Sequence, residues 1–211
     1  MRTNYRFACQ RYIPKLIKKV TLLFLIILHG LNTMAYTIEK QKYRVVQSEK
    51  GFEIRYYPSA TLATVYTSAN SYREIATPGF RKLAGFIFGG NDTNTKIAMT
   101  SPVHMDINDS RSAMSFVMPS KYEQQDLPVP NDSNVILEKS KAEYVAVFGF
   151  RGYASDKVIR RNAEKLESLL KEKEISYHGN FRYLGYNPPY QFIGRRNEII
   201  VSINWSENSK E

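Results

Sequence analysis

The feature that most constrains the fold of this chain is an order of predicted elements that occurs twice. Each half has two segments with a strand pattern, one with a helical period and two further strand segments. The expected strands of the first half are 52–57, 62–67, 96–107 and 113–119. Those of the second half are 135–139, 144–150, 181–187 and 198–203. The polar, proline-containing stretch QQDLPVPNDSN separates the halves, so we expect internal repeats at about 52–119 and 135–203.

Each half carries one predicted helix. The first opens on a capping box, with Glu74 three residues after Ser71, and is expected to run to about Phe88. The pair Pro78-Gly79 inside it predicts a kink or a break. The second helix begins at 155–156, has a clear 3.6-residue apolar period and is expected to end near Glu174.

This order, with antiparallel pairing of neighbouring strands, predicts the α+β class. Two ββαββ halves can face each other as one barrel-like sheet with two helices packed on it. A groove would remain where a helix meets a long loop, and the loop within YNPPYQFIGRRNE (186–198) is the candidate rim. We expect residues 36–211 to form this single domain.

Residues 1–35 have the layout of an export signal. They carry six of the basic residues and no acidic residue, so of the net charge of +10 only 10 − 6 = +4 remains for 36–211. The apolar run VTLLFLIIL is about half as long as the roughly 17–25 residues that usually span a membrane, and Ala35 suits cleavage. We expect a periplasmic or extracellular protein, or a membrane-anchored one if the signal is retained. The small remaining charge argues against a nucleic-acid partner.

The only cysteine, Cys9, lies within the predicted signal. The mature chain would therefore have no disulfide, no thiolate metal site and no cysteine nucleophile. We find no motif of a catalytic centre and expect no enzyme activity. Glu53 and Glu198 are best interpreted as partners of Arg55 or Arg196.

Within the 186–198 loop, the prolines hold the chain extended at low entropy cost. Tyr190, Phe192 and Ile193 can then present an apolar wall, and Arg195 and Arg196 can pair with carboxylates in bidentate geometry. A flat apolar wall with cations at its rim suits a tetrapyrrole with propionates. An internal staple, in which the two arginines pair with Glu198 between the two halves, explains the same residues equally well.

Other candidate sites have simpler interpretations. His104 and Asp106 have the spacing of a metal pair, but we expect both to point at solvent, opposite an apolar strand face. The methionines at 99, 105, 114 and 118 are typical of core filling. The second helix balances acids with bases over most of its length and is expected to be a solvated surface. His178 lies in a predicted turn.

Four separated blocks resemble the SOUL haem-binding protein family. They are FEIRYYPSA, KIAMTSPV, FVMPSKY and GYNPPYQFIGRRNEI, and the resemblance runs from about Phe52 to Ile203. It implies a distorted eight-stranded barrel of two ββαββ repeats with two helices, related to bacterial effector-binding domains. It also implies haem or another tetrapyrrole, held non-covalently in an apolar groove beside the first helix.

Carried onto this chain, the resemblance and the loop together define a predicted ligand groove. Tyr56 stands where some members have an iron-binding histidine, and a tyrosine phenolate can ligate ferric haem. The predicted groove residues are Tyr56, Phe80, Leu83, Ala84, Ile87, Tyr190, Phe192, Arg195 and Arg196. Positions that are basic in other members are here Thr77, Gly85 and Gln191. The alternative is an effector-type domain that binds another small molecule or a peptide without haem.

Overall fold

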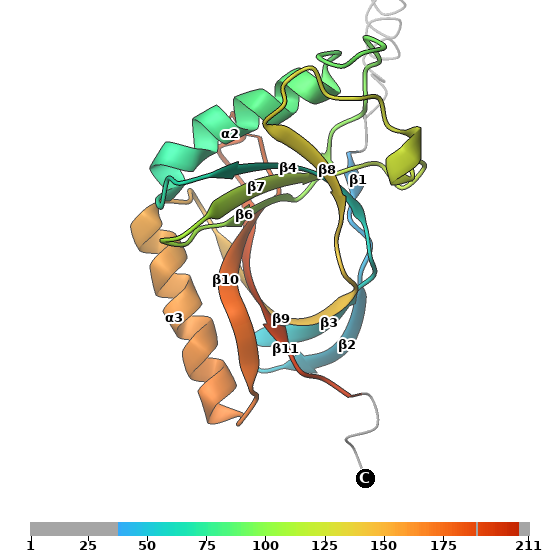
Figure 1. Ribbon diagram of the computed structural model, residues 1–211. Helices are drawn as coiled ribbons and strands as arrows, with labels where there is room; N and C mark the ends of the chain where they lie inside the picture. The colour runs from blue at the N-terminus through green and yellow to red at the C-terminus, as the bar shows by residue number, and fades with distance from the viewer. Residues whose placement is uncertain (1–37, 189, 207–211) are drawn as a thin grey trace, which may run out of the picture. The chain divides into compact units, whose positions relative to one another are not determined.

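The computed structural model describes residues 38–188 and 190–206, so the predicted export signal lies outside the described residues (Figure 1). The helices are α2 (Tyr72–Ile87), α3 (Asp156–Glu172) and a short 3-10 helix, η1 (Gln124–Asp126). The strands are β1 (Glu39–Lys40), β2 (Arg44–Glu49), β3 (Phe52–Tyr57), β4 (Thr61–Thr67), β5 (Thr100–Ser101), β6 (Val103–Asp106), β7 (Ser112–Val117), β8 (Val135–Lys139), β9 (Glu143–Arg151), β10 (Tyr177–Gly185) and β11 (Arg196–Ile203). In this part of the chain, no helix is long and apolar enough to cross a membrane.

Nine strands form one curved sheet in the order β2-β3-β9-β11-β10-β6-β7-β4-β8, and every neighbouring pair is antiparallel. The parallel pair β1-β5 stands apart from it. The α+β class and all eight predicted strand segments are confirmed, although 96–107 is divided at Pro102 into β5 and β6.

The sheet differs from the predicted eight-stranded barrel in two ways. It has a ninth strand, β2, which the sequence analysis did not predict because RVVQSE has a weak apolar alternation and four of its residues are not apolar. The order also ends at β2 on one side and β8 on the other, so the described sheet is open rather than closed into a barrel. Figure 1 shows how strongly it nevertheless curves.

The predicted helix start is confirmed with Ser71 as its N-cap, since the Ser71 hydroxyl accepts a hydrogen bond from the Glu74 backbone N–H at 3.3 Å. Of the two outcomes expected at Pro78-Gly79, a break is excluded, because α2 continues through both residues. Gly79 also has a packing role. A Cβ at this position would lie 3.2 Å from the Met114 sulfur, so a larger residue would require the Met114 side chain to shift for α2 to approach β7 this closely.

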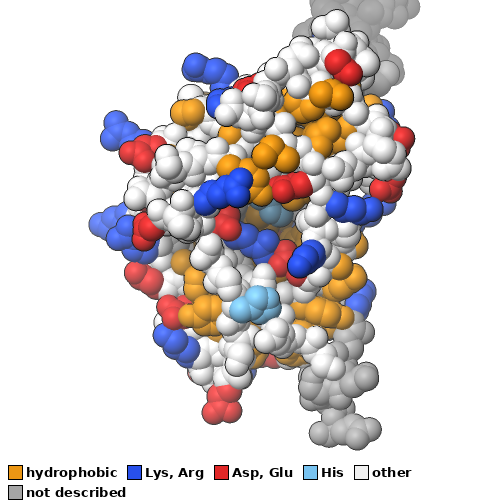
Figure 2. Space-filling model, in the orientation of Figure 1, with side chains coloured by type: hydrophobic (Ala, Val, Ile, Leu, Met, Phe, Trp, Pro, Cys, Tyr) orange, Lys and Arg blue, Asp and Glu red, His pale blue; other side chains and the backbone are white. Residues whose placement is uncertain are grey.

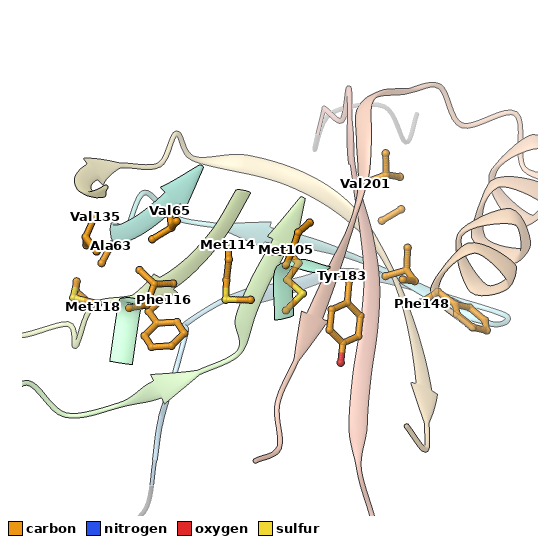
Figure 3. Close-up of a cluster of buried hydrophobic side chains, with 14 of the residues drawn as sticks. Ala63, Val65, Met105, Met114, Phe116, Met118, Val135, Phe148, Tyr183 and Val201 are labelled. Carbon is orange, nitrogen blue, oxygen red and sulfur yellow. The ribbon is translucent and has the colours of Figure 1, made fainter. Parts of the chain in front are cut away.

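The two helices cover the convex face of the sheet, α2 over β4, β7 and β8 and α3 over β9, β10 and β11 (Figure 1). The main core lies between them and the sheet (Figure 3). The prediction that the methionines fill the core is confirmed for Met105, Met114 and Met118, which are buried there, while Met99 packs against its edge. Alternation along each strand places the other half of the side chains on the concave face.

Candidate ligand-binding surface

The loop between β10 and β11 is organised around the Arg195 side chain. This side chain is only 7% exposed, and its Nη1 atom donates to the backbone carbonyls of Pro188 at 2.8 Å and Gln191 at 3.0 Å. The guanidinium also lies 4.7 Å from the ring centre of Tyr153. The buried Arg195 side chain therefore fixes the loop backbone through hydrogen bonds to its carbonyl groups. Its two Nη atoms donate to backbone carbonyls, whereas its buried Nε–H has no partner among the described residues. That Arg195 meets a ligand carboxylate stays a prediction.

Polar side chains fix the rest of the loop. The Asn187 side-chain oxygen accepts from the Arg196 backbone N–H at 2.6 Å, and its amide nitrogen donates to the Gln191 side chain at 2.8 Å. Gly194 adopts a φ of +70°, a conformation that favours glycine. The loop is thus ordered by contacts of its own, and none of these contacts uses its apolar side chains.

Those apolar side chains project outward. Tyr190, Phe192 and Ile193 are 76%, 76% and 88% exposed. Most large apolar residues in a folded domain are buried, so three exposed ones on one ordered loop mark a surface that contacts something else. The exposure expected of Tyr190, Phe192 and Ile193 is thus observed, and their role as a wall for a ligand stays a prediction.

Phe80 on α2 lies at the same end of the sheet as this loop. Its ring packs edge-on against Phe116 with 5.2 Å between ring centres, and it remains 39% exposed. Val103 pairs in register with Phe116 on one side and with Gly185, where the loop begins, on the other. Phe80 is therefore separated from the base of the loop by a single strand.

The other predicted residues of α2 divide between core and surface. Leu83 and Ile87 are 0% and 1% exposed and belong to the core, so the prediction that they line a groove is wrong. The helix turns them toward the sheet, whereas Ala84 is half-buried at the edge of the exposed face. The sequence analysis missed Arg73, an exposed cation two helical turns before Phe80. Its i, i+7 spacing from Phe80, which puts both on one face, is the signal that indicates it.

Tyr56 lies elsewhere. It is half-buried on β3, where its ring packs against Tyr144 at 5.0 Å and beneath the Arg44 guanidinium at 5.7 Å. In the strand order, β3 is near the β2 end, whereas α2 packs on the strands at the β8 end. The predicted groove residues therefore do not form one site, and Tyr56 is one of those that lie away from α2 and the loop.

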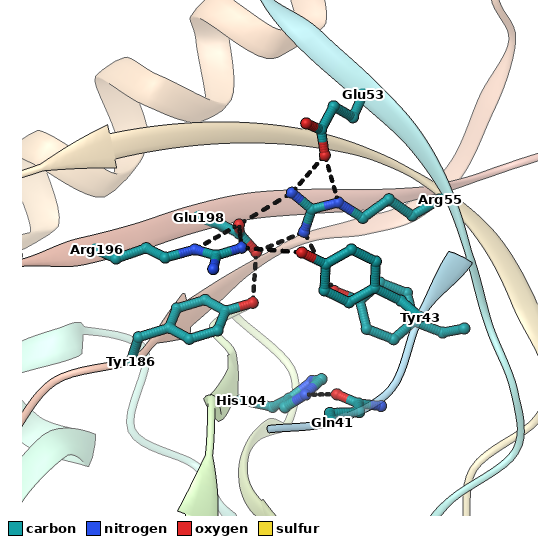
Figure 4. A network of polar contacts seen from close by, with 9 residues as sticks. Gln41, Tyr43, Glu53, Arg55, His104, Tyr186, Arg196 and Glu198 are labelled. Atoms are coloured by element: carbon teal, nitrogen blue, oxygen red, sulfur yellow. Dashed lines mark hydrogen bonds and ion pairs between the residues drawn. The ribbon is translucent and has the colours of Figure 1, made fainter. Parts of the chain in front are cut away.

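The concave face holds a separate, polar cluster centred on Glu198 (Figure 4). Arg55 donates to both carboxylate oxygens of Glu198, at 3.0 and 3.1 Å, across 143 residues of chain. Arg196 donates at 2.7 Å and the Tyr186 hydroxyl donates at 2.7 Å to the same carboxylate. The predicted pairing of Arg196 with Glu198 is confirmed, but both lie on β11, and the contact that joins the two halves is made by Arg55 and not by Arg195. On the face shown in Figure 2, acidic and basic side chains gather around a hollow.

The charges in this concave cluster are matched. Burial alone would raise the pKa of Glu198, but hydrogen bonds and charge from Arg55, with help from Tyr186 and Arg196, hold it below its usual value. Burial and the Glu198 charge raise the pKa of the Tyr186 phenol, so it stays a donor. Glu53 receives a second bond from Arg55, at 2.7 Å. Glu53 and Glu198 are thus paired with arginines as expected, and loss of one partner would leave a buried charge uncompensated.

His104 also lies on the concave face, and the prediction that it points at solvent is wrong. The side opposite the apolar strand face is here the interior of a curved sheet, which leaves the imidazole half-buried. Its Nε2 atom is 2.7 Å from the Gln41 side-chain oxygen (Figure 4). Burial first, and the Arg182 charge second, lower the pKa of His104 to about 3, so the ring is neutral and donates to Gln41.

Asp106, the other member of the supposed metal pair, accepts from Asn108 and Asn180, each at 3.2 Å. Across residues 38–188 and 190–206, no group of histidine, cysteine, aspartate and glutamate side chains could hold a metal ion. His178 is exposed on β10 rather than in a turn.

An open antiparallel sheet with two helices on its convex face is a fold shared with solved structures of low sequence identity. The C-terminal domain of EcmrR superposes with a TM-score of 0.57 at 9% identity, covering 77% of this chain and 98% of that one. An uncharacterized conserved protein from Listeria innocua gives 0.54 at 10% identity, with 82% and 97% covered. These similarities show the fold alone.

Sequence comparison identifies the family. The family model described as SOUL heme-binding protein matches residues 38–202, so the chain belongs to this family. Heme-binding protein 1 of Xenopus laevis is 31% identical over 180 residues, covering 80% of this chain and 94% of the relative. Heme-binding protein 2 of Homo sapiens is 30% identical over 168 residues, with 76% and 81% covered.

Proposed function

We propose that this protein binds haem or a similar tetrapyrrole non-covalently and does not transform it. The observation that carries the proposal is the family match over residues 38–202, with relatives at 30% and 31% identity that are named heme-binding proteins. The exposed apolar side chains of α2 and of the β10–β11 loop support it, because a flat apolar ring gains free energy when such surface leaves water.

The residues that fit such a ligand are those at the rim between α2 and the loop. Phe80, Tyr190 and Phe192 offer exposed aromatic faces, and Ala84 leaves the helix flat between turns. Arg73 is the exposed cation on the same helix face and would meet a propionate. Arg195 acts indirectly, because it orders the loop that carries two of the aromatics.

Neither Tyr56 nor Arg196 fits this surface. Tyr56 is near the other end of the strand order, and Arg196 is held by Glu198 on the concave face. A haem bound at the rim would therefore be held by apolar contacts and an outer cation. The iron, when present, would supply the spectroscopic signature rather than the main attachment to the protein.

A second candidate is a flat apolar ligand that has no iron and no carboxylates, as an effector-type domain would bind. The observation that favours it is the internal commitment of both predicted carboxylate partners, Arg195 and Arg196. Under this proposal the same rim binds, but Arg73 contributes nothing to affinity.

A titration of the full chain with ferric haem, followed in the Soret region, tests the proposal. We expect saturable one-to-one binding, with the same spectrum and affinity for Tyr56→Phe. A parallel titration with metal-free protoporphyrin and with its dimethyl ester separates the two candidates, since only the first needs carboxylates. A spectrum that matches haem free in buffer at every protein concentration would contradict tetrapyrrole binding.

We further propose that residues 1–35 direct export. The support is the sequence pattern alone, a basic start followed by VTLLFLIIL and Ala35. The mass of the protein recovered from the expressing cells tests it. A chain that begins at Tyr36 is the expected product, and an intact leader on a protein retained inside the cell would contradict export.

A further inference from the structure

We propose that the β10–β11 loop, together with the start of α3, is a docking surface for an anionic lipid bilayer. The loop tip carries Tyr190, Phe192 and Ile193, at 76%, 76% and 88% exposure, and Tyr153 beside it is 54% exposed. An exposed apolar tip of this kind is typical of a surface that enters the interface of a membrane, where tyrosine is also favoured. Binding of haem is not needed for this inference.

The tip is ordered before it meets a membrane. The Arg195 guanidinium donates to two loop carbonyls, at 2.8 and 3.0 Å, and Asn187 bonds both Arg196 and Gln191. The backbone polar groups that Arg195 and Asn187 satisfy need no further partner when the tip leaves water. Because the loop is already fixed, insertion has little ordering entropy to offset.

Cations flank Tyr153 along the chain, on the segment that adjoins the loop. The segment from 151 to 161 holds four basic residues and one acidic residue, and all four basic side chains are exposed: Arg151, Lys157, Arg160 and Arg161. The acidic residue, Asp156, accepts a hydrogen bond from the Tyr72 backbone N–H at 2.6 Å. The segment adjoins the loop, because Arg151 pairs in register with Arg196 and the Tyr153 ring holds the Arg195 guanidinium.

This distribution modifies the expectation for the second helix. Its acids do balance its bases overall, but three of its five exposed bases lie in the first two turns, and Glu164 is the first exposed acid after them. Lys157, Arg160 and Arg161 line one shallow hollow with Glu164. An apolar tip with adjacent cations matches a bilayer with negative headgroups, and each cation near such a surface strengthens binding roughly fivefold.

Tryptophan substitution in the full chain tests the proposal at the loop itself. Ile193→Trp reports on the tip, and Val129→Trp, at a site 63% exposed on the segment before β8, is the matched control. Both variants keep Trp205, so its signal is subtracted with the wild-type spectrum. The probes are vesicles of phosphatidylcholine with and without phosphatidylglycerol, some of them brominated to quench buried tryptophan.

We expect the emission of Ile193→Trp to shift to the blue and to be quenched by brominated lipid only in the anionic vesicles, while Val129→Trp is unchanged. Adding Arg160→Ser and Arg161→Ser should weaken the response roughly twenty-fivefold. An unchanged Ile193→Trp spectrum would overturn the proposal, including when the chain sediments with the vesicles through its N-terminal segment. Binding of the tip to an acidic polypeptide such as polyglutamate but not to vesicles would also overturn it.

Discussion

Arg195 and Arg196 are neighbours in the chain but serve two different regions of the molecule. Arg196 points to the concave face, where Glu198 also receives Arg55 and Tyr186. Arg195 points beneath the convex-side loop and bonds only backbone carbonyls and the face of Tyr153. The concave cluster is buried and satisfied, whereas the rim is ordered and still exposes apolar side chains. The first region should therefore determine stability, and the second should determine binding.

The largest expected effect is on the concave cluster. Glu198→Ala leaves the buried Arg55 guanidinium without its main partner, and we expect a loss of about 3–5 kcal/mol in the free energy of unfolding. Glu53→Ala is the matched control, because it removes the half-exposed partner of the same Arg55 and should cost under about 1 kcal/mol. Urea denaturation measures both. Equal losses would show that burial does not distinguish the two carboxylates.

The next prediction compares a substitution on the buried face of α2 with one on its exposed face. Leu83→Ala removes a fully buried side chain and should cost about 2–5 kcal/mol of unfolding free energy, with haem affinity unchanged in the folded fraction. Arg73→Gln, on the exposed face, should leave stability unchanged and weaken haem binding about fivefold to tenfold. A weaker haem affinity for Leu83→Ala and a normal one for Arg73→Gln would reverse the assignment of the two faces.

A smaller effect is expected at the loop. Arg195→Met keeps the apolar stem but removes the hydrogen bonds to the Pro188 and Gln191 carbonyls, at a cost of about 1–3 kcal/mol. Limited proteolysis should then cut within 187–194, and haem affinity should fall because the aromatic side chains are no longer fixed. If the loop stays resistant to protease and affinity is kept, Arg195 does not order the loop.

The effect that is smallest at neutral pH, and appears only on acidification, concerns His104. Its pKa is about 3 in the folded chain and near 6.5 when unfolded, so only the unfolded state takes up the proton between these values. Stability should therefore fall as the pH is lowered from about 6.5 toward 3, before Glu198 and Glu143 add their own losses at lower pH. His104→Gln should flatten the upper part of the melting-temperature profile. An unaltered profile would show that His104 is not the titrating group.

Much of the fold could be predicted because it follows local patterns. The alternation of Phe52 and Ile54 and the capping pair of Ser71 and Glu74 are signals that the structure repeats directly. Strand β2 has no such signal, since none of its residues is fully buried and it pairs only with β3 at the edge of the sheet. The openness of the sheet depends on how far nine strands curve, which no short segment encodes.

The candidate site was predicted less well, because it depends on the face to which each side chain points rather than on residue type. Leu83 and Phe80 are both apolar residues of α2. Only the orientation of the helix on the sheet determines that Leu83 lies in the core and Phe80 at the rim. The side chains of Arg195 and Arg196 point to opposite faces, so one prediction for both could hold for at most one of them. His104 was misjudged since the opposite side of its strand is a concave interior and not solvent.

The most direct test of the account compares two phenylalanines of α2. Phe80 is 39% exposed beside the loop, and Phe88 is 64% exposed at the far end of the helix. Haem titration of Phe80→Ser and Phe88→Ser, followed by the Soret band, measures whether the rim is the binding site. We predict that Phe80→Ser weakens binding about tenfold and that Phe88→Ser binds as the wild type does. Equal affinities in the two variants would contradict the placement of the ligand between α2 and the loop.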